Sequence, residues 1–270
     1  MDSLPTPDFG LVIIGDEILS GKRSDKHLPK VIELLAERGL QLAWAEYVGD
    51  APDRITATLR RAFASGDIVF SCGGIGATPD DHTRQCAALA LDIPLELHPQ
   101  AEALIRERMR DIALEQGIPH EPDRPDNIHR LNMGVFPQGA RVIPNPYNKI
   151  AGFSLRHVHF VPGFPVMAWP MIAWVLDQHY PQLFRREAFV EKSVIVFGAM
   201  EAALTPLMER IEHDHADIKV FSLPSVDHPE YGRHIELGIK GAPGRVDPAY
   251  AQLLAGLADQ DARLGPELVR

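Results

Sequence analysis

The sequence predicts an α/β protein: a three-layer α/β/α domain with a mostly parallel sheet, followed by a small α+β domain. Short apolar runs such as 9–14 and 67–72 end at glycines, which is typical of strands buried on both faces. Amphipathic helical segments alternate with these runs across short loops, as in parallel sheets that are covered on both sides. The chain has 270 residues, of which 45% are hydrophobic, and this size suits one or two domains.

The first third of the chain contains three predicted strand–helix units. The strands are expected, in chain order, at 9–14, 40–48 and 67–72. In the helix predicted at 25–37, apolar residues recur at helical spacing, namely Leu28, Val31, Ile32 and Leu35. The second helix is marked by Ile55, Leu59, Ala62 and Phe63, and the third is expected at 81–91.

The remaining elements of the first predicted domain follow a less regular order. We expect a long helix at 99–116, a loop at 117–127, and two or three short strands within 142–161. Gly163 and Pro165 then introduce a further helix, with Met167, Met171 and Val175 along its core side.

Apolar density falls around 181–191, which predicts a linker and divides the chain into domains 1–180 and 181–270. The predicted elements of the second domain are, in order, a strand at 192–197, a helix at 204–213, strands at 218–223 and 233–240, and a helix at 248–262. Such a unit is near the lower size limit for independent folding.

The charge and cysteine content narrow the class of function. The formal net charge is -10, and a surface of that sign disfavours general nucleic-acid binding. The two cysteines, Cys72 and Cys86, form no CxxC pattern, which favours a reduced interior. No signal peptide and no apolar stretch of membrane-spanning length is evident, so we expect a cytoplasmic protein without a membrane partner.

The segment 72–81 (Cys-Gly-Gly-Ile-Gly-Ala-Thr-Pro-Asp-Asp) joins a predicted buried strand to a helix. Gly73, Gly74 and Gly76 permit positive φ, and their successive amides can form a concave anion site facing the helix N-terminus. The loop lacks the Lys-Ser/Thr of a Walker A loop, and Pro79 stands where a dinucleotide fingerprint needs glycine. A tight turn without a ligand is the alternative interpretation.

Carboxylates follow all three predicted strands of this region, at Asp16 and Glu17, at Asp50, and at Asp80 and Asp81. The carboxyl ends of parallel strands meet at one edge of a sheet, so we expect these acids to converge there. Converging carboxylates repel one another unless a cation lies between them, and Mg²⁺ prefers oxygen ligands. Each acid can instead cap or begin a helix, and that alternative stays open.

A set of motifs runs in order through residues 14–165. It comprises Ile-Gly-Asp-Glu-Ile-Leu-Ser-Gly at 14–21, Asp25, Val-Gly-Asp at 48–50, Gly-Gly-Ile-Gly-Ala-Thr-Pro-Asp-Asp-His-Thr at 73–83, Pro-Gln-Gly-Ala at 137–140, Asn145, Ala-Gly-Phe at 151–153 and Val-Pro-Gly-Phe-Pro at 161–165. This set resembles the molybdopterin-binding domain family of molybdenum-cofactor biosynthesis over about residues 9–178. It is most similar to the amino-terminal part of the competence/damage-inducible CinA proteins. The tail from about Lys192 is similar to the small second domain of CinA-type chains, and we expect no deamidase domain.

The resemblance implies a phosphorylated small molecule as partner, either molybdopterin or a nucleotide diphosphate, together with Mg²⁺ or another divalent cation. It implies catalytic roles for Asp50 and Asp81, with Asp16 as a further metal ligand. The implied ligand-binding residues are Gly15, Asp16, Glu17, Ser20, Gly21, Asp25, Gly73, Gly74, Gly76, Thr78, Asp80, Asn145, Pro162 and Gly163. The CinA branch is linked to hydrolysis of pyrophosphate bonds in nucleotides such as ADP-ribose, and a related domain to FAD hydrolysis. Family members commonly form homo-oligomers, which we therefore expect here.

The chain departs from the CinA pattern at three places. Asp25-Lys26-His27 replaces the usual Asp-Thr-Asn, and Gly76-Ala77-Thr78 replaces Gly-Pro-Thr. Val166-Met167 stands where an acid is usual. These changes bear on the identity of the substrate more than on the fold.

Three functions follow from these observations. The first is a metal-dependent hydrolase of a nucleotide pyrophosphate linkage, of the ADP-ribose or FAD class. The second is a module that binds molybdopterin or a nucleotide without catalysis. The third is a scaffold with a vestigial site, which the altered 25–27 and 166 positions keep open.

Overall fold

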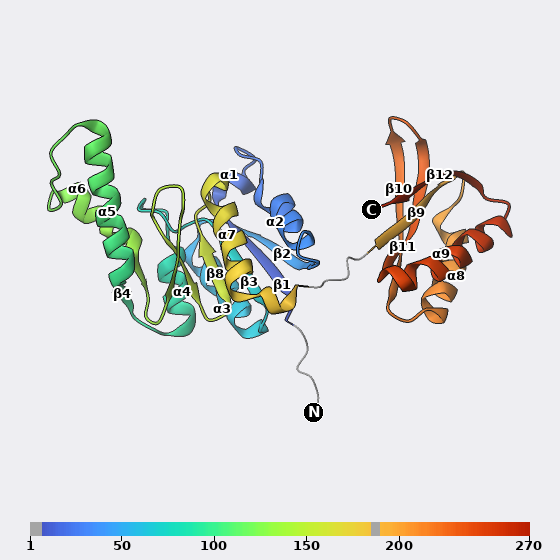
Figure 1. Cartoon of the computed structure of the whole chain (residues 1–270), viewed down its shortest axis with the longest axis horizontal. Coiled ribbons are helices and arrows are strands. Elements are labelled where there is room, and N and C mark those ends of the chain that lie inside the picture. The colour runs from blue at the N-terminus through green and yellow to red at the C-terminus, as the bar shows by residue number, and fades with distance from the viewer. Residues whose placement is uncertain (1–6, 185–189) are drawn as a thin grey trace, which may run out of the picture. The chain divides into compact units, whose positions relative to one another are not determined.

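The computed structural model describes residues 7–184 and 190–270. The chain divides into two compact units, Met1–Phe184 and Arg185–Arg270 (Figure 1). Of the linker predicted at 181–191, residues 185–189 lie outside the described part, and Pro181–Leu183 form a short 3-10 turn, η2. Within the described ranges, no helix combines the length and the apolar character needed to cross a lipid bilayer.

A six-stranded sheet forms the centre of the first unit, in the order β2-β1-β3-β8-β7-β6. Its strands are β1 (Phe9–Ile14), β2 (Leu42–Val48), β3 (Ile68–Cys72), β6 (Arg141–Ile143), β7 (Gly152–Leu155) and β8 (Val158–Val161). The first four strands in that order run parallel, whereas β7 is antiparallel to both β8 and β6. β1 and β3 are buried along their whole length, since other elements cover both of their faces.

Helices cover the two faces of this sheet. On one face, α2 (His27–Ala36) and α7 (Pro165–His179) share a core cluster with Leu11 of β1. On the other face, α3 (Pro52–Ser65) and α4 (Thr83–Leu91) share a second cluster with Val12 of β1. Successive side chains of β1 point to opposite faces of the sheet, so Leu11 packs against one helix layer and Val12 against the other. The predicted three-layer fold with a mostly parallel sheet is confirmed.

A separate lobe of the first unit is built from residues between β3 and β6. The short strands β4 (Leu95–Leu97) and β5 (Val135–Pro137) pair antiparallel, and between them lie α5 (Pro99–Gln116), α6 (Pro125–Arg130) and the 3-10 turn η1 (Leu131–Gly134). The helix predicted at 99–116 is present with the same bounds. The loop predicted at 117–127 runs into α6, because Pro125 suits the first turn of a helix.

Two details of the predicted helices are wrong. Ile32 was placed on the apolar side of its helix, but it is 48% exposed in α2, whose buried side carries Val31, Leu34 and Leu35. The helix predicted from Asp81 begins only at Thr83, because the preceding turn bends back on itself.

The second unit is a small α+β structure, as predicted. Its antiparallel sheet has the order β10-β11-β9-β12, with β9 (Val190–Phe197), β10 (Ile218–His228), β11 (Gly232–Gly241) and β12 (Arg263–Val269). The helices α8 (Glu201–Asp214) and α9 (Pro243–Ala258) share one core cluster with β9 and β11. The predicted helix at 248–262 is α9, which begins and ends earlier, and β12 was not predicted.

Candidate functional site

The turns after β1, β2 and β3 lie at one edge of the sheet. These strands are parallel neighbours, and Ile14 of β1 pairs with Val48 of β2 while Ile13 pairs with Cys72 of β3. The segments that follow them are the short helix α1 (Asp16–Leu19), Gly49-Asp50 and the glycine loop 73–81. The structure therefore brings the three predicted acid-containing turns together.

Asp16 and Asp50 are joined by reciprocal hydrogen bonds. The Asp16 amide donates to Asp50 Oδ2 at 2.9 Å, and the Asp50 amide donates to Asp16 Oδ1 at 3.2 Å. A Cβ at Gly49 would lie 2.4 Å from Asp16 Oδ1, so this close contact requires glycine. One oxygen of each carboxylate is thus fixed, and the turns after β1 and β2 hold each other in place.

Asp50 is surrounded by other negatively charged side chains. Partial burial raises its pKa above the usual range, and the charges of Asp16, Glu17 and Asp80 raise it further, although the Asp16 amide opposes this. Asp16, Glu17, Asp50 and Asp80 therefore lie close enough for their charges to interact, as expected for acids at one sheet edge. Among residues 7–184 and 190–270, however, no group of three or more His, Cys, Asp or Glu side chains is arranged to hold a metal ion.

The glycine loop packs tightly against its own protein. Gly73 has φ 106°, and a Cβ there would lie 2.3 Å from the Ile14 carbonyl oxygen. Gly74 has φ 68°, and its Cβ would lie 2.2 Å from Thr83 Oγ1, which donates to the Gly73 carbonyl. Gly163 passes close to the same loop, because a Cβ on it would lie 3.4 Å from Gly73 Cα. Both the close packing and the left-handed backbone thus require glycine at 73 and 74.

Several backbone amides of this loop remain available. In the described part of the chain, the amides of Gly74, Ile75, Gly76 and Ala77 have no hydrogen-bond acceptor. These amides are consecutive and begin at a residue with positive φ, an arrangement that can form a concave anion site.

Asp81 closes the far end of the loop. Its Oδ2 accepts hydrogen bonds from the Thr78 amide at 2.9 Å and from Thr78 Oγ1 at 2.5 Å. A Cβ at Gly76 would lie 2.5 Å from the same oxygen. Asp80 lies in the exposed turn between them. Neither acid belongs to the first turn of α4, so the helix-start alternative does not apply to them.

Asp25 anchors α2 to the site edge. Its Oδ1 accepts the His27 amide at 2.8 Å, and its Oδ2 accepts the Leu28 amide at 3.0 Å and Tyr47 Oη at 2.9 Å. Burial and the hydrogen bond to Asp25 raise the pKa of Tyr47 to about 12. His27 Nε2 contacts the Gly163 carbonyl at 3.0 Å, which ties the turn after β8 to the start of α2.

Other predicted ligand-binding residues lie in the turn after α1 and in the loop after β6. Gly15 lies between β1 and α1 with a positive φ of 155°, and Ser20 and Gly21 lie in the exposed turn that follows α1. Asn145 is only 4% exposed, and its side chain is bonded within its own loop to Tyr147, Asn148 and Ile150. The side chain of Asn145 therefore shapes the loop after β6, and none of its hydrogen bonds among the described residues reaches the glycine loop.

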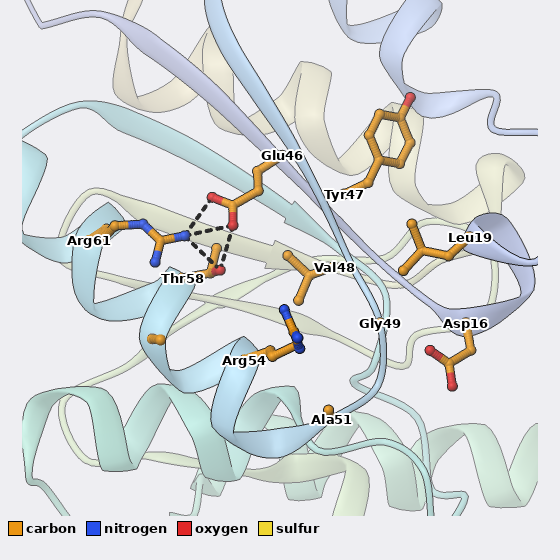
Figure 2. A pocket seen from close by; sticks show the side chains of 11 residues that line it. Asp16, Leu19, Glu46, Tyr47, Val48, Gly49, Ala51, Arg54, Thr58 and Arg61 are labelled. Carbon is orange, nitrogen blue, oxygen red and sulfur yellow. Dashed lines mark hydrogen bonds and ion pairs between the residues drawn. The ribbon is translucent and has the colours of Figure 1, made fainter.

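Two cavities lie at this edge, one beside the Asp16–Asp50 pair and the other beside the glycine loop. The first, of about 410 Å³, lies between β2 and α3 and reaches Asp16 and Gly49. Figure 2 shows Arg54 and Arg61 on one side of it, with the Glu46 carboxylate accepting hydrogen bonds from Arg61 and Thr58. The second cavity, of about 400 Å³, lies between the glycine loop and the α6–η1 segment.

The arginines in these cavities were not predicted as site residues. Arg54 and Arg61 line the first cavity, and Arg84 lines the second. Arg84 directly follows the recognised motif at 73–83, but only the fold shows that its side chain is buried beside the loop.

Several known proteins are similar to this chain in sequence. The chain is 27% identical over 259 residues to a protein of Caldivirga maquilingensis, covering 91% of this chain and 95% of that one. A CinA-like protein of Gloeobacter violaceus is 28% identical over 270 residues, covering 94% of this chain and 60% of the relative. A CinA-like protein of Anaeromyxobacter dehalogenans is 32% identical over 58% of this chain, which spans only 37% of that relative.

One solved structure shares the fold of the first unit. The crystal structure of the protein CinA, of unknown function, from Thermoplasma acidophilum has a TM-score of 0.53 and 25% identity. It covers 63% of this chain and 97% of its own. Residues 10–184 match the family model described as "Probable molybdopterin binding domain". The chain therefore belongs to the molybdopterin-binding domain family and is similar to CinA-like proteins.

Proposed function

We propose that this protein binds a nucleotide diphosphate of the ADP-ribose or FAD class at the edge formed by β1, β2 and β3, and hydrolyses its pyrophosphate linkage. The observation that carries the proposal is the placement of four unpaired loop amides, at 74–77, on the same sheet edge as the Asp16–Asp50 pair. Amides of this kind bind phosphate oxygens, and carboxylates are the usual partners of a phosphate-bound cation.

A divalent cation fits the donor set, although not as a cage made by protein alone. Asp16 and Asp50 each have a second oxygen outside their mutual hydrogen bonds, and a bound cation would relieve the excess negative charge around Asp50. Mg²⁺ is commonly held by one or two carboxylates together with substrate phosphates, so three protein ligands are not required. Asp16 and Asp50 are the residues that would hold it, whereas Asp81 is not among the carboxylates whose charge acts on Asp50.

When bound, such a cation polarises a phosphoryl group and makes a water more acidic. The chain's own residues supply the rest of the proposed site. The amides of Gly74 to Ala77 stabilise negative charge on a phosphate without moving, because β1 and α4 fix the loop. Asp50 is held at this edge by its hydrogen bonds with Asp16, so its second oxygen would hold the cation beside these amides.

Turnover of ADP-ribose and FAD with Mg²⁺ or Mn²⁺ tests this proposal. We expect Asp50→Asn to lower kcat about 100-fold or more, since a neutral amide holds a divalent cation far less well than a carboxylate. Asp92→Asn is the matched control, because it also removes one charge but lies at the left-handed end of α4, where asparagine is tolerated. Equal activity of the two variants, or no hydrolysis of either compound by the natural protein, would refute hydrolysis at this site.

Binding without catalysis is the second candidate. It needs only the available amides of 74–77, which can bind phosphate oxygens without an activated water. This function predicts that a pterin or nucleotide binds in calorimetry with the same affinity in the presence and absence of EDTA, and that no product forms.

A further inference from the structure

The second cavity contains a buried arginine that its surroundings only partly satisfy. Arg84 is 4% exposed on the first turn of α4, and its Nη1 donates to the Ile75 carbonyl at 2.8 Å. A guanidinium has five N–H donors, and buried arginines are almost always paired with an acid. Among the described residues, no carboxylate lies within ion-pair distance of Arg84. Arg84 is nevertheless one of the residues that line the cavity.

The charge around Arg84 is correspondingly unbalanced. Burial lowers its pKa below the usual range, and the more distant charge of Asp81 opposes this shift. Asp81 also lines the cavity, but its Oδ2 already accepts two hydrogen bonds from Thr78. Within the described residues, the guanidinium thus has one hydrogen bond, to the Ile75 carbonyl, and the charge of Asp81 at longer range, which leaves donors for a further anion.

The wall opposite Arg84 is made by the lobe between β4 and β5. Asn132 Nδ2 donates to His129 Nδ1 at 3.3 Å, so Nδ1 is an acceptor and the proton is on Nε2. His129 Nε2 can then donate to the Ala77 carbonyl at 3.1 Å. This contact connects α6 to the glycine loop at Ala77, whose amide is available and which also lines the cavity.

We propose that this cavity is a phosphate subsite, in which Arg84 binds a terminal phosphate or pyrophosphate group and the His129–Asn132 pair forms the wall that encloses it. The inference rests on the proposed function for its ligand class, and it adds the residue that recognises the phosphate. A guanidinium binds two phosphate oxygens at once, whereas a lysine provides a point charge. The same loop would then contact phosphate from two sides, through its amides and through Arg84.

Binding of inorganic pyrophosphate in the presence of EDTA tests the subsite independently of hydrolysis. We expect calorimetry to show binding to the natural protein, weakened roughly tenfold or more by Arg84→Lys, which keeps the charge but loses the two-pronged contact. Arg61→Lys is the matched control, since it makes the same change in the first cavity, and its affinity should stay within about twofold of the natural protein.

A measurement on the natural protein covers the case in which Arg84→Lys does not fold. On titration with pyrophosphate, the NMR signal of the Arg84 side-chain Nε–H and that of the His129 ring should shift, while the Arg61 signal should not. No binding, equal affinities in the two variants, or an unmoved Arg84 signal at saturation would overturn the subsite. Arg84-dependent binding without any nucleotide turnover would support the subsite and contradict only the proposed hydrolysis.

Discussion

At the scale of the single residue, Gly74 determines the shape of the glycine loop. Its φ of 68° lies in the left-handed region, and an added Cβ would lie 2.2 Å from Thr83 Oγ1. We expect Gly74→Ala to lower the free energy of unfolding of the first unit by about 2–4 kcal/mol, combining backbone strain with the clash. Urea unfolding followed by circular dichroism measures this change.

Gly66→Ala separates the strain from the clash. Gly66 also has positive φ, 81°, but an added Cβ there would meet nothing within 4 Å. This control should cost only about 1 kcal/mol. If the two variants lose the same stability, the contact with Thr83 is not what requires glycine at position 74.

The residue types of the site were visible in the sequence, but their contacts were not. Gly73 and Gly74 were predicted because glycines suit a phosphate loop, yet close packing against Ile14 and Thr83 requires them equally. Asp16 and Asp50 could be placed on one edge from the strand order alone, as the reciprocal hydrogen bonds bear out. The burial of Arg84 depends on its three-dimensional surroundings, and no local pattern encodes that.

At the scale of the single element, the buried residue His159 of β8 makes the stability of the first unit depend on pH. The ring is fully buried, with Nδ1 2.8 Å from Ser154 Oγ and Nε2 2.7 Å from Tyr180 Oη. Burial lowers its pKa from 6.5 to about 3, and the charges of His179, Arg141 and His157 act in the same direction. The folded protein therefore keeps this imidazole neutral over a pH range in which the unfolded chain protonates it.

Acidification should accordingly destabilise the first unit. Between pH 6.5 and about 3 the unfolded state binds one more proton than the folded state at this group, so stability falls as pH falls. The expected slope is about 1.4 kcal/mol per pH unit, or roughly 2 kcal/mol between pH 6.5 and 5. Urea unfolding at several pH values should show this slope reduced in His159→Gln and kept in His120→Gln, whose side chain is exposed. A slope unchanged in His159→Gln would show that other groups cause the acid sensitivity.

The long helix α5 and the short strands β6 to β8 were predicted, whereas the short strands β4 and β5 were not. The helix α5 shows its solvated charges over 18 residues, whereas β4 and β5 have three residues each and no alternation can be read. In β12, Gly265 and Pro266 interrupt the strand pattern. Its pairing with β9 therefore comes from tertiary contacts rather than from local propensity.

At the scale of the whole molecule, each unit has a hydrophobic core of its own. The clusters around Leu59 and Val31 consist of residues from the first unit, and the cluster around Leu237 consists of residues from the second. The composition of the chain near residue 181 predicted a division of this kind, because apolar density falls between the two patterned regions. A core that is complete within one unit can unfold without the other.

Matched core truncations test whether the two units unfold separately. Leu59 in α3 and Leu237 in β11 are both fully buried, so replacing either with alanine should cost about 2–5 kcal/mol. We expect calorimetry of the whole chain to show two transitions, with Leu237→Ala lowering one and Leu59→Ala the other. Hydrogen exchange would assign each transition to its unit. Because the candidate site lies in the first unit, pyrophosphate binding should be unchanged in Leu237→Ala at temperatures where the first unit stays folded. A single transition that both variants lower equally would instead mean that the two cores are energetically coupled.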